Sequence, residues 1–284
     1  MPLLPHRKGR NMAEKKAFYE LQFPDAFMFA ATMEDEEICR GVLERVMGIP
    51  IKAVKVIGEA SMLVNPDYRG VRLDVYADDR AGSVYNVEMQ TTNKKNLPRR
   101  SRFYQSQMDM VELKPGEEFN ELPKSFIIFI CTFDPFGHGL YRYTYMNRCS
   151  ETGEELGDEA YKVFLSTKGK NDTEEAPELV RFLKYVDGAA TAEESQSDEL
   201  ISKIEARIAE IKQSRGMEVR YMLFSEMLSD ERKEGRQEGI QEGCDKLLQL
   251  MNLMIADGDA DKLPLLSKDA GFLQEMFEKY HIEV

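Results

Sequence analysis

Hydrophobic residues at the start of the chain follow a helical period. Over residues 18–47 they recur at spacings of three and four, which predicts helices with a break near residues 32–35. Gly48 and Pro50 are typical helix-ending residues, so the second helix is expected to stop there. The apolar residues over 51–58 are mostly β-branched and indicate a short strand or an extended connection.

The next segment changes from a helical period to alternation. Residues 71–77 and 84–90 alternate apolar and polar positions and are rich in strand-forming residues. The polar stretch 78–82, which contains a glycine, lies between them. Two strands joined by a short turn of this kind predict a β-hairpin.

Helical and strand patterns are mixed in the rest of this half. A helix is predicted over residues 97–112, with an apolar side formed by Phe103, Met110 and Val111. Residues 125–132 are almost continuously apolar, which is typical of a strand buried on both faces. Shorter strand-like stretches follow at 141–146 and 161–166. The mixture predicts an α/β or α+β domain that ends near residue 187.

Residues 188–284 carry only helical patterns after a small, polar stretch over 188–197 that resembles a linker. The sequence therefore predicts an all-α C-terminal appendage. Gly235, Gly239 and Gly243 recur every fourth residue within it. Such glycines suit either close packing of a helix against a partner or a hinge between two helices, and both interpretations stay open. Packing against a partner would make the protein a homodimer through its C-terminal helices.

The charge and composition of the chain limit its functional classes. Its 284 residues include 38 basic and 51 acidic side chains, for a formal net charge of −13. This balance argues against a general polyanion binder, because phosphate contacts need Lys and Arg. No apolar run approaches the roughly 20 residues that a membrane helix needs, so we expect no membrane-spanning segment.

Cysteine and histidine usage bears on the compartment. The four cysteines are scattered without a CxxC spacing and only three histidines occur, which argues against a structural zinc site. Scattered thiols are typical of a reduced, cytoplasmic protein. Residues 1–17 begin with a basic segment that lacks the apolar centre of a signal peptide, and we expect them to form a flexible lead.

Three polar side chains lie within the predicted hairpin. Glu88 and Gln90 are two residues apart and therefore point to the same sheet face, and Asp74 on the other strand can fall beside Glu88. Adjacent carboxylates repel unless a cation lies between them, and oxygen ligands without a thiol or imidazole suit Mg²⁺ or Mn²⁺. The alternative interpretation is an ordinary solvated hairpin face, and the spacing alone does not separate the two.

A basic segment follows the hairpin. Its positive residues, with no acidic residue among them, are Lys94, Lys95, Arg99, Arg100 and Arg102. Local enrichment of this kind indicates contact with a nucleic-acid backbone, whereas the alternative is a solvated helix start. Tyr104 and Gln107 are three residues apart on one helical face and are further candidates for lining a site there.

Taken together, these segments resemble the PD-(D/E)XK nuclease family transposases, which are also described as recombination-promoting nucleases. Asp74 lies in the motif Arg-Leu-Asp-Val-Tyr-Ala-Asp, and Glu88 and Gln90 lie in Tyr-Asn-Val-Glu-Met-Gln. The likeness covers most of residues 20–187. The segments that carry it are 23–27, 72–78, 85–90, 97–109 and 122–137.

The resemblance implies a restriction-endonuclease-like core, with a central mixed sheet flanked by helices and a metal bound by Asp74 and Glu88. Gln90 stands where the wider superfamily usually has Lys, and an amide supplies neither a positive charge nor a general base. Either Gln90 only positions water, or a nearby cation replaces the Lys, or activity is low. Asp25 is a candidate for a third metal carboxylate, or alternatively for a helix N-cap.

The sequence thus predicts a nuclease-like domain over residues 18–187 and a helical region over 188–284. The predicted function is a Mg²⁺- or Mn²⁺-dependent DNA endonuclease of mobile-element or recombination type, in which the metal activates a water that hydrolyses a phosphodiester bond. The alternative is a catalytically weak or inactive nuclease fold that acts as a DNA-binding or protein-interaction module.

Overall fold

The computed structural model describes residues 16–58, 61–62, 71–72 and 74–282. The chain divides into two compact units, Met1–Glu218 and Val219–Val284, and each is considered by itself. Residues 1–15 of the predicted flexible lead and Leu73 of the predicted hairpin lie outside the described residues.

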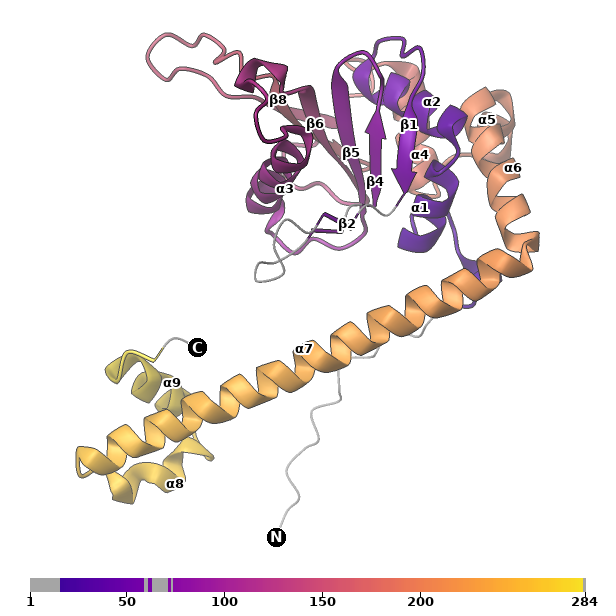
Figure 1. Cartoon of the computed structure of the whole chain (residues 1–284). Coiled ribbons are helices and arrows are strands. Elements are labelled where there is room, and N and C mark those ends of the chain that lie inside the picture. Colours follow the sequence, from indigo (N-terminus) through magenta and orange to yellow (C-terminus); the bar gives the residue numbers. More distant parts are fainter. Residues whose placement is uncertain (1–15, 59–60, 63–70, 73, 283–284) are drawn as a thin grey trace. The chain divides into compact units, whose positions relative to one another are not determined.

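A six-stranded mixed sheet forms the centre of the first unit, in the order β1-β4-β5-β6-β8-β7 (Figure 1). Its strands are β1 (Lys55–Gly58), β4 (Val75–Asp78), β5 (Ser83–Gln90), β6 (Lys124–Cys131), β7 (Arg142–Tyr145) and β8 (Ala160–Ser166). β5, β6 and β8 run parallel, and the other pairings are antiparallel. A separate antiparallel pair joins β2 (Ser61–Met62) to β3 (Val71–Arg72). The mixed sheet is confirmed, and so is the hairpin between β4 and β5. The predicted first strand began at residue 71, whereas Val71–Arg72 pairs with β2 and not with β5.

Helices flank this sheet, as the predicted fold requires. They are α1 (Ala26–Met33), α2 (Glu36–Met47), α3 (Leu97–Glu112), α4 (Pro177–Val186), α5 (Ala192–Ser197) and α6 (Glu199–Gln213). Short 3-10 turns occur at Phe18–Glu20 and Phe119–Glu121. The first α-helix begins at Ala26 and not near residue 18, because Pro24 disfavours helical backbone at the residue before it.

The two faces of the sheet have separate cores. Residues of α1, α2, α4 and α6 pack on the face that carries Val75, Tyr85 and Val87, and α3 packs on the face that carries Tyr76 and Phe129 (Figure 1). This α/β/α layering leaves Glu88 between the sheet and α3, since it shares a face with Val84.

The predicted apolar side of α3 is wrong. Phe103, Met110 and Val111 are exposed, and the helix instead buries Leu97, Ser101, Gln105 and Met108. Two of these buried residues are polar, and each donates a hydrogen bond, whereas Gln105 Oε1 has no partner in the described part of the chain. The Gln105 amide donates to the Ser125 hydroxyl at 2.7 Å, and the Ser101 hydroxyl donates to the Pro98 carbonyl at 2.9 Å.

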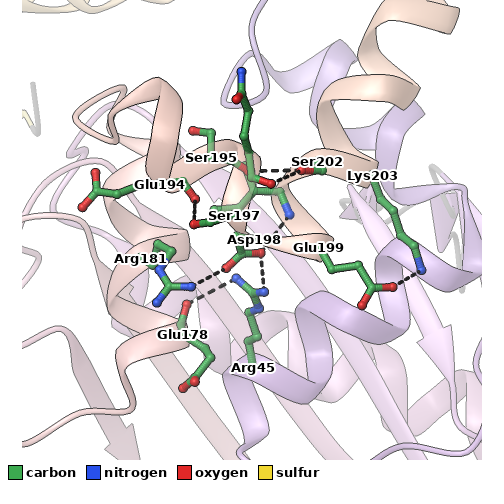
Figure 2. Close-up of polar contacts among 12 residues, drawn as sticks. Arg45, Glu178, Arg181, Glu194, Ser195, Ser197, Asp198, Glu199, Ser202 and Lys203 are labelled. Atoms are coloured by element: carbon green, nitrogen blue, oxygen red, sulfur yellow. Dashed lines mark hydrogen bonds and ion pairs between the residues drawn. The ribbon is translucent and has the colours of Figure 1, made fainter.

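α5 and α6 belong to the first unit, although the sequence pattern assigned them to the appendage. Leu200 and Ile204 of α6 are buried in the same core as α2 and α4. Asp198 begins α6 and accepts a hydrogen bond from the Ile201 backbone at 3.1 Å. It also forms ion pairs with Arg45 at 2.5 Å and with Arg181 at 3.4 Å, so that one carboxylate joins α2, α4 and α6 (Figure 2).

The second unit begins at Val219, and its described residues are mainly helical. α7 runs without a break from Arg215 to Ala256 through the glycine repeat, and α8 (Leu263–Leu266) and α9 (Ala270–Lys279) follow the 3-10 turn Ala260–Lys262. Leu250, Met254, Leu266, Met276 and Phe277 form its core. A Cβ atom added at Gly239 or Gly243 would meet nothing within 4 Å. Homodimerisation through these helices stays a prediction.

None of the helices within the described residues is both long enough and apolar enough to cross a membrane.

We expect Asp198→Ala to lower the free energy of unfolding by about 3 kcal/mol, because it leaves the Arg45 guanidinium without its buried partner and removes a helix cap. Urea denaturation followed by circular dichroism measures this difference. Glu210→Ala, which breaks an exposed ion pair with Arg207 in the same helix, is the matched control and should cost less than about 1 kcal/mol.

The effect of Asp198→Ala should depend on pH. Burial alone would raise the pKa of Asp198, but hydrogen bonds from Arg45 and the Ile201 N–H lower it below the ordinary 3.8. A lowered carboxyl pKa stabilises the folded protein above the ordinary pKa, and this stabilisation is lost as the pH falls through the lowered value. The difference between parent and variant should therefore shrink below about pH 4, and a constant difference down to about pH 2 would contradict this assignment.

Candidate functional site

The hairpin register brings Asp74 and Glu88 together. Val75 of β4 pairs with Val87 of β5, so Asp74 lies opposite Glu88 at the end of the paired segment. The Asp74 backbone N–H donates to Glu88 Oε1 at 3.2 Å, and the Met89 N–H donates to Asp74 Oδ2 at 3.1 Å. Each carboxylate is thus positioned by the backbone of the other strand, and the adjacency predicted from the sequence is confirmed.

Glu88 is a buried carboxylate, with 2% of its surface exposed. Burial raises its pKa well above the usual range for glutamate, the Asp74 charge raises it further, and Arg100 opposes both effects. A divalent cation at the two carboxylates would favour their ionised forms, in the same direction as Arg100 acts on Glu88.

Arg100 is the positive partner of this carboxylate pair. Its Nη2 donates to Glu88 Oε2 at 2.8 Å and its Nη1 donates to Gln90 Oε1 at 3.0 Å. The guanidinium carbon lies 5.1 Å from the ring centroid of Tyr104 and 5.3 Å from that of Phe129, which are cation–π distances. Arg100 therefore points toward the carboxylates, whereas Arg99 and Arg102 of the same segment are exposed.

The amide of Gln90 is oriented by the same contact. Because Arg100 donates to the amide oxygen, the amide nitrogen is the end that faces Glu88 Oε2, at 3.5 Å. Gln90 therefore presents a hydrogen-bond donor to the carboxylate site, while Arg100 supplies a permanent positive charge beside it.

The remaining predicted nucleic-acid contacts lie on the surface. Lys94, Lys95, Arg99 and Arg102 are exposed, and none of them forms an ion pair with a residue within the described ranges. They lie at or just before the N-terminal end of α3, whose first residue is Leu97. Gln107 is half-buried on the same helix, and its role stays a prediction.

Tyr104 lies with Arg100 and not with the surface cations. Its ring stacks on that of Phe129, with a centroid separation of 6.2 Å. Burial raises the pKa of the Tyr104 phenol to about 12, and the nearby Glu88 carboxylate also raises it. Tyr104 is therefore protonated at neutral pH and offers a hydroxyl near the carboxylates.

The structure gives Asp25 contacts of its own. Its carboxylate forms an ion pair with Lys16 at 2.8 Å and accepts a hydrogen bond from the Gln22 N–H at 2.8 Å. It does not accept a capping bond from α1. Among the described residues no group of three or more His, Cys, Asp and Glu side chains is arranged to hold a metal ion, so Asp25 as a third ligand stays a prediction.

The donor set of Asp74 and Glu88 nevertheless fits a hard divalent cation. Mg²⁺ is commonly held by one or two carboxylates, with waters and substrate phosphate oxygens completing its octahedron. Both carboxylates here supply oxygen, and the charge imbalance at Glu88 favours a cation. Asp74 and Glu88 are therefore the two residues that would hold the metal.

One buried polar residue at this site was missed from the sequence. Asn86 lies on the same face of β5 as Glu88, is fully buried, and neither polar atom of its amide has a hydrogen-bond partner in the part of the chain that the structure describes. Its position two residues before Glu88, within an otherwise apolar strand, was the available signal.

Comparison with known proteins connects this geometry to a family. A family model described as PD-(D/E)XK nuclease family transposase matches residues 26–237. No curated protein and no solved structure matches the chain significantly.

We expect Glu88→Gln to stabilise the metal-free protein at high pH by roughly 1–3 kcal/mol, since it removes a buried charge that Arg100 only partly offsets. A raised carboxyl pKa means that folding favours the protonated group, so the parent loses stability as the pH rises from the ordinary glutamate pKa through the raised one. Urea denaturation in EDTA measures the difference in unfolding free energy between Glu88→Gln and the parent, and it should be made at about pH 5 and at about pH 9.

The control for this experiment is Glu118→Gln, since Glu118 is exposed. It should change the unfolding free energy by less than about 0.5 kcal/mol at either pH. An advantage of Glu88→Gln that is the same at both pH values would contradict the raised pKa.

Proposed function

Because the chain belongs to the PD-(D/E)XK nuclease family transposases, we propose that it is a metal-dependent DNA endonuclease of mobile-element or recombination type. The observation that supports this proposal most directly is the pairing of half-buried Asp74 with buried Glu88, with Gln90 and Arg100 bonded beside them. Two carboxylates, an amide donor and a fixed cation form a set that suits hydrolysis of a phosphodiester bond.

Asp74 and Glu88 would hold the divalent metal in this proposal. A bound Mg²⁺ or Mn²⁺ would supply Lewis acidity toward a phosphate oxygen and would lower the pKa of a bound water. The protein contributes the rigidity of the two carboxylates, because each accepts a backbone N–H from the opposite strand. Such preorganisation avoids a reorganisation cost during the reaction.

Gln90 has the role of positioning water. Its amide nitrogen faces Glu88, so it can donate to an attacking oxygen located beside that carboxylate. An amide does not remove a proton at neutral pH, and Gln90 is therefore an orienting donor and not a general base.

Arg100 supplies the positive charge that lysine usually supplies in the wider superfamily. It reaches the site from α3 and not from β5, and it contacts Glu88 and Gln90 with two different nitrogens. A guanidinium remains protonated, so its role is to stabilise negative charge on the phosphate that is being attacked. This interpretation selects one of the three explanations of Gln90 that the sequence left open, namely replacement by a nearby cation.

DNA would approach along the N-terminal end of α3. Lys94, Lys95, Arg99 and Arg102 are exposed there, next to the residue that turns inward to the carboxylates. Phosphate contacts by these four cations position a backbone without reading its sequence. Binding should therefore depend strongly on salt.

We expect purified protein to cut or nick DNA with Mg²⁺ or Mn²⁺, and Asp74→Ala and Glu88→Ala each to abolish cutting, because each removes a metal carboxylate. Arg100→Gln should reduce kcat by roughly 10²- to 10³-fold, the usual effect of losing one preorganised charge donor, while Arg100→Lys should keep part of the rate. Gel assays on supercoiled plasmid measure all four variants. Glu118→Ala, an exposed carboxylate, is the control.

Metal binding provides an independent test of the same site. Calorimetric titration with Mg²⁺ should show binding to the parent that the Asp74→Ala/Glu88→Ala double variant lacks. Equal heats for the two proteins, together with no cutting by the parent, would support the alternative of a nuclease fold that binds DNA or protein without catalysis. Cutting by Asp74→Ala and Glu88→Ala that equals cutting by the parent would show instead that the active site lies elsewhere.

A further inference from the structure

A second cavity lies on the other flank of α3, on the same sheet face as Glu88. It measures about 430 Å³, which is within the usual range for ligand sites of roughly 300–1,000 Å³. The residues that matter for its chemistry are Arg102, Phe136, Tyr145, Lys162 and Phe164. None of them belongs to the carboxylate site, although Arg102 and Arg100 come from the same turn of α3.

Three aromatic rings form the apolar part of this cavity. Phe136 contacts Tyr145 at a centroid separation of 5.2 Å and Phe164 at 5.1 Å, and Tyr145 contacts Phe164 at 5.7 Å. Phe164 is buried, whereas 45% of the Tyr145 surface is exposed. The cluster therefore holds Tyr145 in place from behind and leaves part of this ring open to a ligand.

Two cations accompany the rings. Arg102 is exposed, and neither it nor Lys162 forms an ion pair with a residue in the described part of the chain. Lys162 lies opposite Tyr145 in the pairing of β8 with β7, and its ammonium donates only a long hydrogen bond, 3.4 Å, to the Ala160 carbonyl. Lys162 also acts on Asp109, whose pKa burial raises and the nearby ammonium lowers. Aromatic surface beside positive charge is complementary to a flat ring that carries a phosphate.

The cavity is close to the carboxylate site along the sheet. Glu88 of β5 pairs with Phe129 of β6, which pairs with Phe164 of β8, and the two phenylalanine rings stack at 5.3 Å. The distance from β5 to β8 is two strand spacings, which is about 10 Å. A nucleic-acid strand with one phosphate at Asp74 and Glu88 therefore has a neighbouring base within reach of the cavity.

We propose that this cavity binds an unstacked base of the nucleic-acid strand that is being cut, with Tyr145 stacking on the base and Arg102 and Lys162 contacting adjacent phosphates. The inference rests on the proposed function and narrows its substrate to single-stranded or locally unpaired DNA. A base inside a duplex is stacked on both faces and does not reach a protein ring without leaving the helix.

Equilibrium binding to oligonucleotides in EDTA tests the cavity without any cutting. Fluorescence anisotropy would compare a labelled single strand of about 12 nucleotides with a blunt duplex of the same sequence. The parent should bind the single strand more tightly. Tyr145→Ala should weaken that binding roughly 5- to 100-fold, as expected for loss of one base–aromatic stack, whereas Tyr145→Phe should keep it. Arg102→Gln should reduce the salt dependence by about one phosphate contact.

Matched controls are available in the same unit. Tyr19→Ala removes an exposed tyrosine and Lys52→Gln an exposed cation, and neither residue lines the cavity. Both should leave binding within about twofold of the parent. Circular dichroism of every variant checks that a weakened interaction does not come from unfolding.

Three results would overturn the inference: unchanged single-strand affinity in folded Tyr145→Ala, a parent that binds the blunt duplex as tightly as the single strand, or a parent that binds neither. Displacement of the single strand by a mononucleotide at equal concentration would also overturn it, because the cavity would then serve a free nucleotide. If the parent still cuts DNA with Mg²⁺ while any of these results is found, only the proposal that the cavity binds a base is rejected, and the proposed endonuclease activity stands. If the parent does not cut DNA but its single-strand binding depends on Tyr145, only the proposed catalysis is rejected.

Discussion

The buried carboxylate of Glu88 is the constraint on which the arrangement of this domain depends. A carboxyl group in an apolar layer needs partners in fixed places, and here they come from a neighbouring strand and from a helix across the sheet face. β4 must pair with β5 in one register for the Asp74 N–H to reach Glu88, and α3 must lie with Arg100 toward the same oxygen pair. A shift of either element by one residue would leave the buried Glu88 carboxyl without one of these hydrogen-bond partners.

Arg100 connects this constraint to the chemistry of the site. Its two hydrogen bonds join a strand carboxylate to a strand amide, and the rings of Tyr104 and Phe129 lie within cation–π distance of it. If Arg100 supplies the positive charge of the proposed site from the helix, β5 can carry an amide at position 90. Arg102, on the same turn of α3, lines the cavity on the opposite flank of the helix. One turn of α3 therefore contributes an arginine to the carboxylate site and another to the cavity.

The sequence was informative where structure depends on local period and less so where it depends on distant partners. Alternation located the β4–β5 hairpin, and the apolar run located β6, because each pattern is complete within a few residues. The buried side of α3 was mispredicted because Gln105 is stabilised by Ser125, twenty positions away. Arg99, Arg100 and Arg102 look alike in a sequence, and only the helix phase separates the one that faces Glu88. The packing of α6 likewise depends on Asp198 meeting Arg45.

Net charge shows most clearly why a sum over the chain is a poor guide to binding. The total of −13 would disfavour DNA if charge acted uniformly, but solvent ions screen exposed charges beyond about 10 Å at ordinary salt. Over residues 188–243 the 13 acidic side chains exceed the 8 basic ones, whereas residues 94–102 carry five positive charges and no negative ones. A DNA strand on α3 would therefore respond mainly to the cations of α3, and a metal between Asp74 and Glu88 would cancel the nearest repulsion. A small number of contacts between cations and phosphates favours modest affinity for DNA. Discrimination between DNA substrates would then come from how a phosphate fits the carboxylate site and how a base fits the cavity on the other flank of α3.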